Sequence, residues 1–245
     1  MVSQPERNVD KVDEEVLAAA RDLVASRLPT ATSVILAKSA LGERRSSKSD
    51  LDFVVIEVFA ESRWEGLHGG RWPVEMFISD LEGWERYVAH EVRERRPVVL
   101  HITAPGVPLT INSMTTDMQL HAQQLLTEGP SPLTTSELAL HCRLLTDLVD
   151  DLEDAGPGPE RRFVIEATFR QSAELWLMSN DQWLGSGKWL ARTVSEKAPK
   201  LSTELALAVD VAHQGDTARL LAVARFILDR AGGPVRSNWI EPVPL

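Results

Sequence analysis

The chain has 245 residues, with 26 Lys and Arg against 36 Asp and Glu, giving a formal net charge of −10. With 43% hydrophobic and 25% charged residues, the composition is typical of a globular protein and excludes a disordered or fibrous one. The acidic balance disfavours binding to nucleic acid, which depends on neutralising phosphates. It favours a cationic partner or a metal-bound anion, although many proteins carry such a charge only for solubility.

Several classes of protein are excluded by simple sequence features. No apolar run approaches the roughly 20 residues that span a bilayer, and the N-terminal segment lacks the apolar core of a signal peptide. Cys142 is the single cysteine, which excludes an internal disulfide and a cysteine-based zinc site. We therefore expect a cytoplasmic protein that does not bind a membrane.

The first half of the chain mixes helix and strand patterns. Apolar residues recur either at helical spacing or in short runs bounded by turn residues. The expected elements are helices at 10–28 and 80–96 and strands at 33–37, 51–58, 72–79 and 97–102, with 63–70 as a turn between the second and third strands.

From about residue 114 the strand patterns vanish and helical spacing dominates. The expected helices are at 115–127, 134–153, 159–182, 187–197, 201–213 and 216–231. Strands followed by helices predict an α+β protein with a mixed-sheet domain at 1–113 and a helical bundle domain at 114–245. The last residues, around Trp239, form a tail that either packs on the bundle or stays loose.

The most informative residues are acidic ones at the start of an apolar strand. Asp50 and Asp52 are two residues apart, so the alternation of a strand places both on one face. Two carboxylates so close repel each other unless a cation lies between them, and Mg²⁺ takes such oxygen ligands. An Asp-X-Asp pair at a strand entrance also serves as a turn or capping device.

Glu75 supplies a third carboxylate in the strand expected at 72–79, which we expect to lie beside the strand that Asp50 and Asp52 enter. Its flanking residues, Val74 and Met76, are apolar, so we expect its carboxylate not to be a solvated surface charge. Three acids at one edge of a sheet could hold one or two metal ions, or accept the proton of an attacking hydroxyl.

The segment around these acids resembles a known family. A strand, a small-residue turn with Ser39, about ten residues, and then Ser49-Asp50-Leu-Asp52 entering a strand is similar to the pattern of the polymerase-β-like nucleotidyltransferases. The layout is most similar to the aminoglycoside (kanamycin-type) members, in which a comparable domain precedes a helical one. The resemblance implies that the turn at Ser39 approaches nucleotide phosphates, and that Asp50, Asp52 and Glu75 form the metal site.

One residue departs from that pattern. The family has a glycine immediately before the serine, where the missing Cβ lets the backbone approach a phosphate, but this chain has Lys38. Lys38 either donates a positive charge to the phosphates or narrows the pocket, and the sequence does not decide between the two.

Further cations are candidates for phosphate binding. Arg44, in the loop between Ser39 and Asp50, either neutralises charge on the transferred phosphorus or is a solvated loop residue. Lys188 follows Gly185-Ser186-Gly187 at an expected helix start, where free backbone N–H groups favour an anion. The alternative is that these glycines only separate two helices and that Lys188 is a surface residue.

The resemblance implies a Mg²⁺-dependent nucleotidyltransferase that moves a nucleoside monophosphate from a triphosphate, such as ATP, to a hydroxyl. The expected site lies in a cleft between the two domains, and the acceptor is either a small aminoglycoside-like molecule or a protein side chain. The alternative is a nucleotide-binding regulatory or toxin–antitoxin-type partner protein that has lost efficient transfer because of Lys38. A homodimer is compatible with either function.

Overall fold

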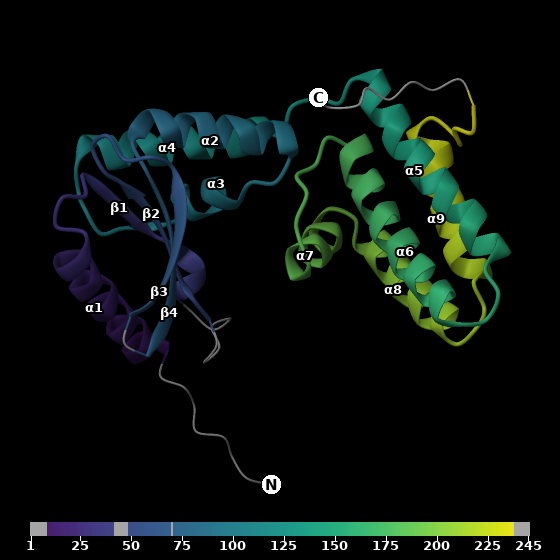
Figure 1. Cartoon of the computed structure of the whole chain (residues 1–245), viewed down its shortest axis with the longest axis horizontal. Helices are drawn as coiled ribbons and strands as arrows, with labels where there is room; N and C mark the ends of the chain where they lie inside the picture. Colours follow the sequence, from purple (N-terminus) through teal and green to yellow (C-terminus); the bar gives the residue numbers. More distant parts are fainter. Residues whose placement is uncertain (1–8, 42–48, 70, 238–245) are drawn as a thin grey trace, which may run out of the picture. The chain divides into compact units, whose positions relative to one another are not determined.

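A computed structural model describes residues 9–41, 49–69 and 71–237. The contacts divide the chain into two compact units, Met1–Glu128 and Gly129–Leu245, which we call the first and second units and describe separately (Figure 1). The first unit contains α1 (Val9–Arg27), β1 (Ser33–Leu36), the 3₁₀ turn η1 (Lys38–Ala40), β2 (Leu51–Ile56), β3 (Arg63–Gly69), β4 (Trp72–Ser79), α2 (Leu81–Glu94), α3 (Val98–Thr103), β5 (Val107–Pro108) and α4 (Ser113–Glu128). The second unit contains α5 (Thr135–Asp154), α6 (Pro159–Ser179), α7 (Lys188–Lys197), α8 (Pro199–His213) and α9 (Ala218–Ala231).

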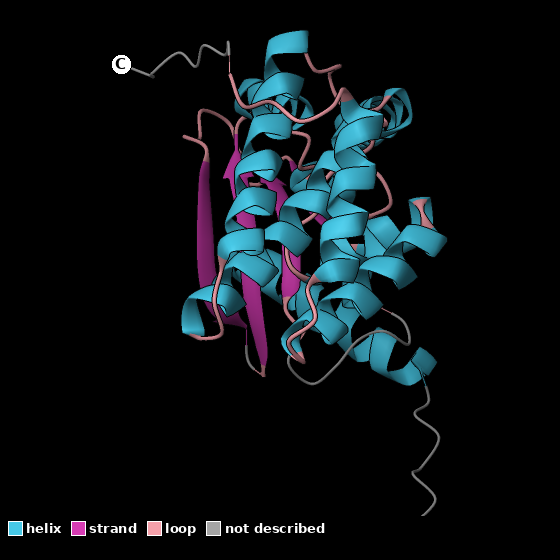
Figure 2. Cartoon of the chain, turned by 90° about the vertical axis from the view of Figure 1, so that its right-hand side faces the viewer, coloured by secondary structure: helices cyan, strands magenta, loops and turns pink. Residues whose placement is uncertain are grey.

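The predicted α+β class is confirmed. The strands of the described residues all belong to the first unit, and the second unit is built from helices and their connections (Figure 2). The five strands form one sheet in the order β3-β4-β2-β1-β5. Within it, β2 and β4 are parallel, whereas the other neighbouring pairs are antiparallel.

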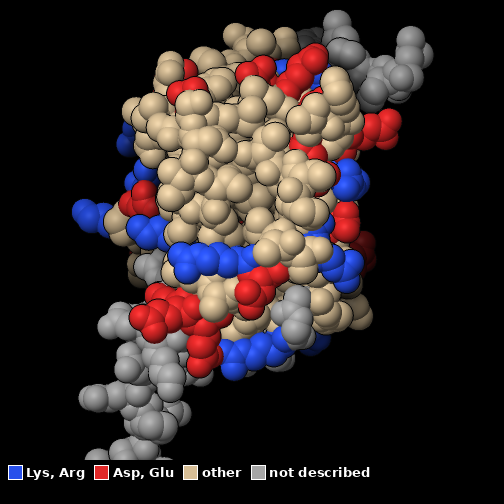
Figure 3. All heavy atoms as spheres, turned by 90° about the vertical axis from the view of Figure 1, so that its left-hand side faces the viewer, with Lys and Arg blue, Asp and Glu red and all other residues tan. Residues whose placement is uncertain are grey.

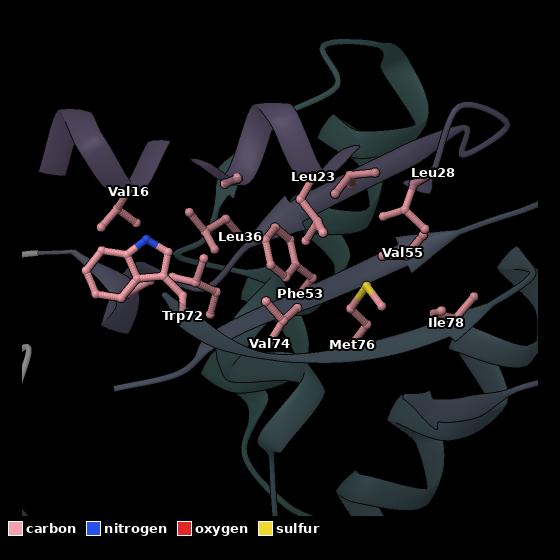
Figure 4. Close-up of a cluster of buried hydrophobic side chains, with 14 residues drawn as sticks. Val16, Leu23, Leu28, Leu36, Phe53, Val55, Trp72, Val74, Met76 and Ile78 are labelled. Atoms are coloured by element: carbon pink, nitrogen blue, oxygen red, sulfur yellow. The ribbon is translucent and has the colours of Figure 1, made fainter. Parts of the chain in front are cut away.

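One face of the sheet is covered by α1. Alternate residues of β2 and β4, such as Phe53 and Met76, point to this face and pack against Val16 and Leu23 of α1 (Figure 4). These side chains are almost completely buried. The same alternation sends the intervening residues, Asp52 and Glu75 among them, to the opposite face.

The opposite face is covered in part by α2, α3 and α4, which contact β4, β2 and β1. Glu91 of α2 joins this layer together, because its carboxylate accepts hydrogen bonds from the backbone N–H groups of Val98 (2.9 Å), Val99 (2.7 Å) and Leu100 (3.0 Å). These groups begin α3 and have no partner within that helix. Burial raises the pKa of the Glu91 carboxyl to about 7, and the three N–H donors offset only part of that effect.

Two predicted elements in the first unit are wrong. Residues 63–70, expected as a turn, contain the edge strand β3 (Arg63–Gly69), which pairs with β4 along its whole length. Its polar sequence, RWEGLHG, lacks the apolar alternation of a buried strand because it lies at the sheet edge. Residues 97–102, expected as a strand, form most of α3 instead: Val99, Leu100, Ile102 and Thr103 are buried at helical spacing, and Glu91 caps the helix.

The division between the units differs from the predicted boundary at residue 113. α4 packs against α3 and β1 and therefore belongs to the first unit. Gln119 of α4 donates to the carbonyl oxygens of Thr103 (3.2 Å) and Gly106 (2.9 Å), and the Thr115 hydroxyl lies 2.8 Å from that of Ser33 in β1. Helical spacing carries no information about the layer that a helix joins. The sequence pattern alone therefore assigned α4 to the bundle.

Gly106 is needed for the close packing of the segment between α3 and β5. A Cβ at this position would lie 2.3 Å from the backbone oxygen of Ile102 and 2.3 Å from Cγ2 of Ile35. Because a backbone atom cannot give way as a flexible side chain does, we expect Gly106→Ala to lower the free energy of unfolding by about 1–3 kcal/mol. Urea denaturation would measure this change. Gly156→Ala, where nothing lies within 4 Å of the added Cβ, is the control and should have little effect.

The second unit has its own core. Buried residues of α5, α6, α8 and α9 pack together, including Leu145, Leu175 and Leu220. Thr134 and Glu137 form a reciprocal capping box at the start of α5. Cys142 lies in this core, and burial raises the pKa of its thiol.

Charged side chains are unevenly distributed on one face of the molecule. On the face shown in Figure 3, charged side chains gather in the lower part and at the margins, and a broad central area carries none. Among the described residues, no helix has the length and apolar character needed to cross a membrane.

Candidate active site

The strand pairing brings two of the three predicted acids together. Asp52 of β2 and Glu75 of β4 are direct partners in the parallel register and lie on the same face of the sheet. Asp50, two residues before Asp52, immediately precedes β2 and continues the same alternation. The prediction that Glu75 lies on a strand adjacent to the Asp-X-Asp pair is therefore confirmed.

The environment of Glu75 differs from the prediction. Its apolar neighbours Val74 and Met76 point to the α1 face, whereas Glu75 points to the opposite face and is exposed. Its partner on the other side, in the edge strand β3, is Gly66, which has no side chain to cover it. The apolar residues on either side of Glu75 indicate burial of the opposite face of the strand, not of the face on which Glu75 lies. The expectation that the Glu75 carboxylate is not solvated is therefore wrong.

The turn after β1 lies at the same end of the sheet as the two aspartates. β1 runs antiparallel to β2, and the backbone N–H of Ala37 donates to the carbonyl oxygen of Asp52 (2.8 Å). Lys38 and Ser39 follow in η1, and both are exposed. The backbone thus places the Ser39 turn beside the start of β2.

The loop between Ser39 and Asp50 is only partly described. Arg44 lies outside the described residues, so its predicted role stays a prediction. Ser49 is described and half-buried, directly before Asp50.

The donor chemistry of the three acids suits a hard divalent cation, which prefers carboxylate oxygens. Within 9–41, 49–69 and 71–237, however, no three or more His, Cys, Asp or Glu side chains are grouped so that they could hold a metal ion. The backbone register therefore fits a shared ion between Asp52 and Glu75, whereas the side chains of the three acids are not gathered around one point.

Sequence reasoning missed an aromatic side chain on the same face. Trp64 of β3 is paired with Phe77, two positions along β4 from Glu75, and remains 44% exposed. Its ring lies 5.6 Å from that of Phe77, and its Nε1 donates to the Tyr87 hydroxyl at 3.4 Å. Assigning 63–70 to a turn hid this residue. Because RWEGLHG has no apolar alternation, the sequence carried no signal for the face on which Trp64 lies.

Beside Glu75, the surface of β3 is open. A Cβ added at Gly66 would meet nothing closer than the Val74 carbonyl oxygen, at 4.0 Å. Gly66 therefore leaves a bare stretch of backbone between the exposed Trp64 and the exposed His68, directly next to the carboxylate of Glu75.

Lys188 begins α7 in the second unit, as predicted. It and Arg192 lie near the exposed ring of Trp189, with Nζ 6.0 Å and the guanidinium carbon 4.6 Å from the ring centroid. Gly185 has a local structural role, because a Cβ there would lie 2.5 Å from the backbone nitrogen of Leu190. Lys188 belongs to a different unit from the acids, so its binding to nucleotide phosphates stays a prediction.

Glu166 and Glu174 of α6 each pair with a basic side chain of the second unit. Glu174 forms an ion pair with Arg170 of the same helix (3.2 Å). Glu166 Oε1 lies 2.8 Å from Nε2 of His213 in α8.

Comparison with known proteins gives a weak structural likeness. No protein-family profile and no curated protein matches the sequence. Among solved structures, the chain is similar to a nucleotidyltransferase-like protein from Exiguobacterium sibiricum, with a TM-score of 0.43 and 13% sequence identity over 88% of this chain and 77% of that one. This likeness is too weak to assign the chain to a family or to an activity.

Proposed function

We propose that the first unit binds a nucleoside triphosphate with Mg²⁺ and transfers the nucleoside monophosphate to an acceptor hydroxyl. The observation that carries this proposal is the register of Asp52 with Glu75 on parallel strands, with Asp50 preceding β2 on the same alternation. The Ser39 turn lies at the same end of the sheet, as the sequence pattern of the polymerase-β-like nucleotidyltransferases requires.

Asp50 and Asp52 would hold the metal ion, with Glu75 as a further ligand or as the proton acceptor. When bound, the ion supplies positive charge beside the phosphate oxygens. Binding requires the carboxylates to turn toward one another, which like charges resist until a cation neutralises them. Glu75 is exposed and Asp50 and Asp52 are half-buried, so rotation about their side-chain bonds is not blocked by the protein core.

In the proposed reaction, the acceptor oxygen forms a bond to the α-phosphorus as the bond from that phosphorus to the bridging oxygen of pyrophosphate breaks. The hydroxyl proton passes to a carboxylate, for which Glu75 is the exposed candidate. Ser39 and the turn around it position the triphosphate. Lys38, Arg44, Ser49 and Lys188 are the candidates for contacts to the phosphates.

The surface beside Glu75 favours an acceptor that carries positive charge. Exposed carboxylate attracts a cation, and an exposed tryptophan ring such as that of Trp64 can pack against the flat face of a sugar or a cationic group. A small amino sugar has both features, and a basic protein segment with a hydroxyl residue is the alternative acceptor.

Two measurements on the full chain test this function. Calorimetry should detect ATP binding that requires Mg²⁺, and radiolabelled nucleotide should pass to an acceptor with release of pyrophosphate. Amino sugars and proteins with basic, serine-rich segments are the acceptors to screen first. The absence of Mg²⁺-dependent ATP binding would contradict the proposal.

Lys38 favours a second candidate function, a nucleotide-binding regulatory or partner-binding protein without efficient transfer. Its side chain stands where the family pattern has a glycine, at the first residue of η1. Nucleotide binding without pyrophosphate release across many acceptors would support this function. Release restored by Lys38→Gly would identify Lys38 as the reason for the loss.

A further inference from the structure

A cavity lies entirely within the second unit, and none of the residues that line it is assigned to the proposed reaction. Its volume is about 700 Å³, and it is lined by residues of α6, α8 and α9 and by Ala198, which joins α7 to α8. Its apolar walls include Trp176 of α6, Leu201 of α8 and Val223 and Phe226 of α9. Phe226 is 50% exposed, so a large apolar side chain faces solvent at this site.

Among the side chains that line the cavity, positive charges outnumber negative charges. Glu204 of α8 accepts from Arg219 of α9 at 2.8 Å (Nη2) and 3.3 Å (Nε), so these two groups neutralise each other and join the helices that form the walls. Lys200, the third charged lining residue, has no ion-pair partner in the described part of the chain. It lies in the first turn of α8, where the helix dipole adds positive charge. The cavity therefore has apolar walls and one excess positive charge.

We propose that this cavity binds a small amphipathic anion, namely an aliphatic carboxylate whose chain packs on the apolar walls and whose carboxylate pairs with Lys200. The volume is within the range of about 300–1,000 Å³ typical of small-molecule pockets. An anion suits the excess cation, whereas a cationic amphiphile of the same length meets repulsion from Lys200. This site is independent of the carboxylates of the first unit.

Decanoate is the probe for the first experiment, titrated into the full chain below its micelle concentration and followed by calorimetry. Saturable binding at one site per chain is expected. Octanoate should bind about tenfold more weakly, because it buries two fewer methylene groups. Decylammonium, with the same tail and the opposite charge, should bind more weakly than decanoate.

Variants locate the site. Ala222 lines the cavity and is exposed, so Ala222→Trp introduces a large ring at the cavity wall without displacing a buried residue, and it should reduce decanoate affinity at least about tenfold. Ala222→Ser is the control at the same position and should bind decanoate with an affinity within about twofold of wild type.

Lys200→Glu should weaken decanoate binding by about three- to tenfold, while decylammonium gains affinity. Lys197→Glu makes the same charge change outside the cavity lining and should alter neither.

Four results would overturn the proposal. The first is the absence of saturable decanoate binding, and the second is equal affinity for decanoate and decylammonium. The third is unchanged decanoate binding in an Ala222→Trp variant that far-UV circular dichroism shows to be folded. The fourth is a concentration-dependent dimer that Ala222→Trp dissociates, which would assign the apolar walls to a second copy of the chain.

Discussion

Asp52→Asn is expected to lower the rate of Mg²⁺-dependent nucleotide transfer at least about a hundredfold, because asparagine keeps the shape of the side chain but loses the charge that holds the cation. Asp50→Asn should have the same effect. Calorimetry should show weaker Mg²⁺-dependent ATP binding by both variants, and pyrophosphate release measures the rate once an acceptor is found. Since Asp50 and Asp52 are half-buried, the thermal unfolding midpoint should change little.

Glu65→Gln is the matched control for these variants. Glu65 lies on β3 next to Gly66, but the alternation of the strand turns it to the opposite face, where it pairs with Arg63. The same loss of one carboxylate charge should therefore leave transfer unchanged. Full activity in Asp50→Asn or Asp52→Asn would remove that residue from the mechanism, whereas equal loss in Glu65→Gln would point to a general effect of net charge.

The largest expected effect on stability comes from Glu91 and depends on pH. Its pKa is about 7 in the folded protein against an ordinary value of 4.5, so between these values the folded state holds a proton that the unfolded state has released. Stability from this group is therefore greatest at low pH and falls as pH rises from 4.5 to about 7. The change corresponds to about 3 kcal/mol in the free energy of unfolding.

Glu91→Gln measures this effect, because glutamine cannot ionise and still presents an oxygen to the start of α3. Urea denaturation at a series of pH values measures the unfolding free energy of both proteins. As pH rises through this range, the value for wild type should fall relative to the value for Glu91→Gln. Glu94→Gln, an exposed position on the same helix, should show no such trend. A flat difference for Glu91→Gln would mean that Glu91 is ionised in the folded protein throughout.

Glu91→Ala tests the structural part of the same contact. It leaves the buried N–H groups of Val99 and Leu100 without an acceptor and should lower the free energy of unfolding by about 2–4 kcal/mol at low pH. Rescue of most of this loss by glutamine at the same position would assign the loss to hydrogen bonding rather than to packing.

The sequence predicted well wherever the local pattern and the tertiary environment agree. β4 (Trp72–Ser79) has the predicted limits, because its alternate residues are buried against α1. α2 and the bundle helices carry apolar faces at helical spacing, with turn residues at their ends. The pairing of the Asp-X-Asp strand with the strand of Glu75 followed from the same reasoning.

The wrong predictions have a common physical origin. β3 has little apolar alternation because it is an edge strand. It adopts the strand conformation because it pairs through hydrogen bonds with β4. α3 has strand-like residues, but the buried carboxylate of Glu91 and packing between α2, α4 and the sheet make it a helix. In both segments, a partner outside the segment decides the conformation.

Taken alone, the sequence determined the order of most elements, the α+β class and the face shared by Asp50 and Asp52, since these depend on periodicity over a few residues. Only the tertiary structure decided that Gly66 leaves Glu75 exposed, that Trp64 lies on the same face, and that α4 belongs to the first unit. Those features depend on which strand or helix lies alongside, and the periodicity within one segment carries no signal for the segment that it packs against.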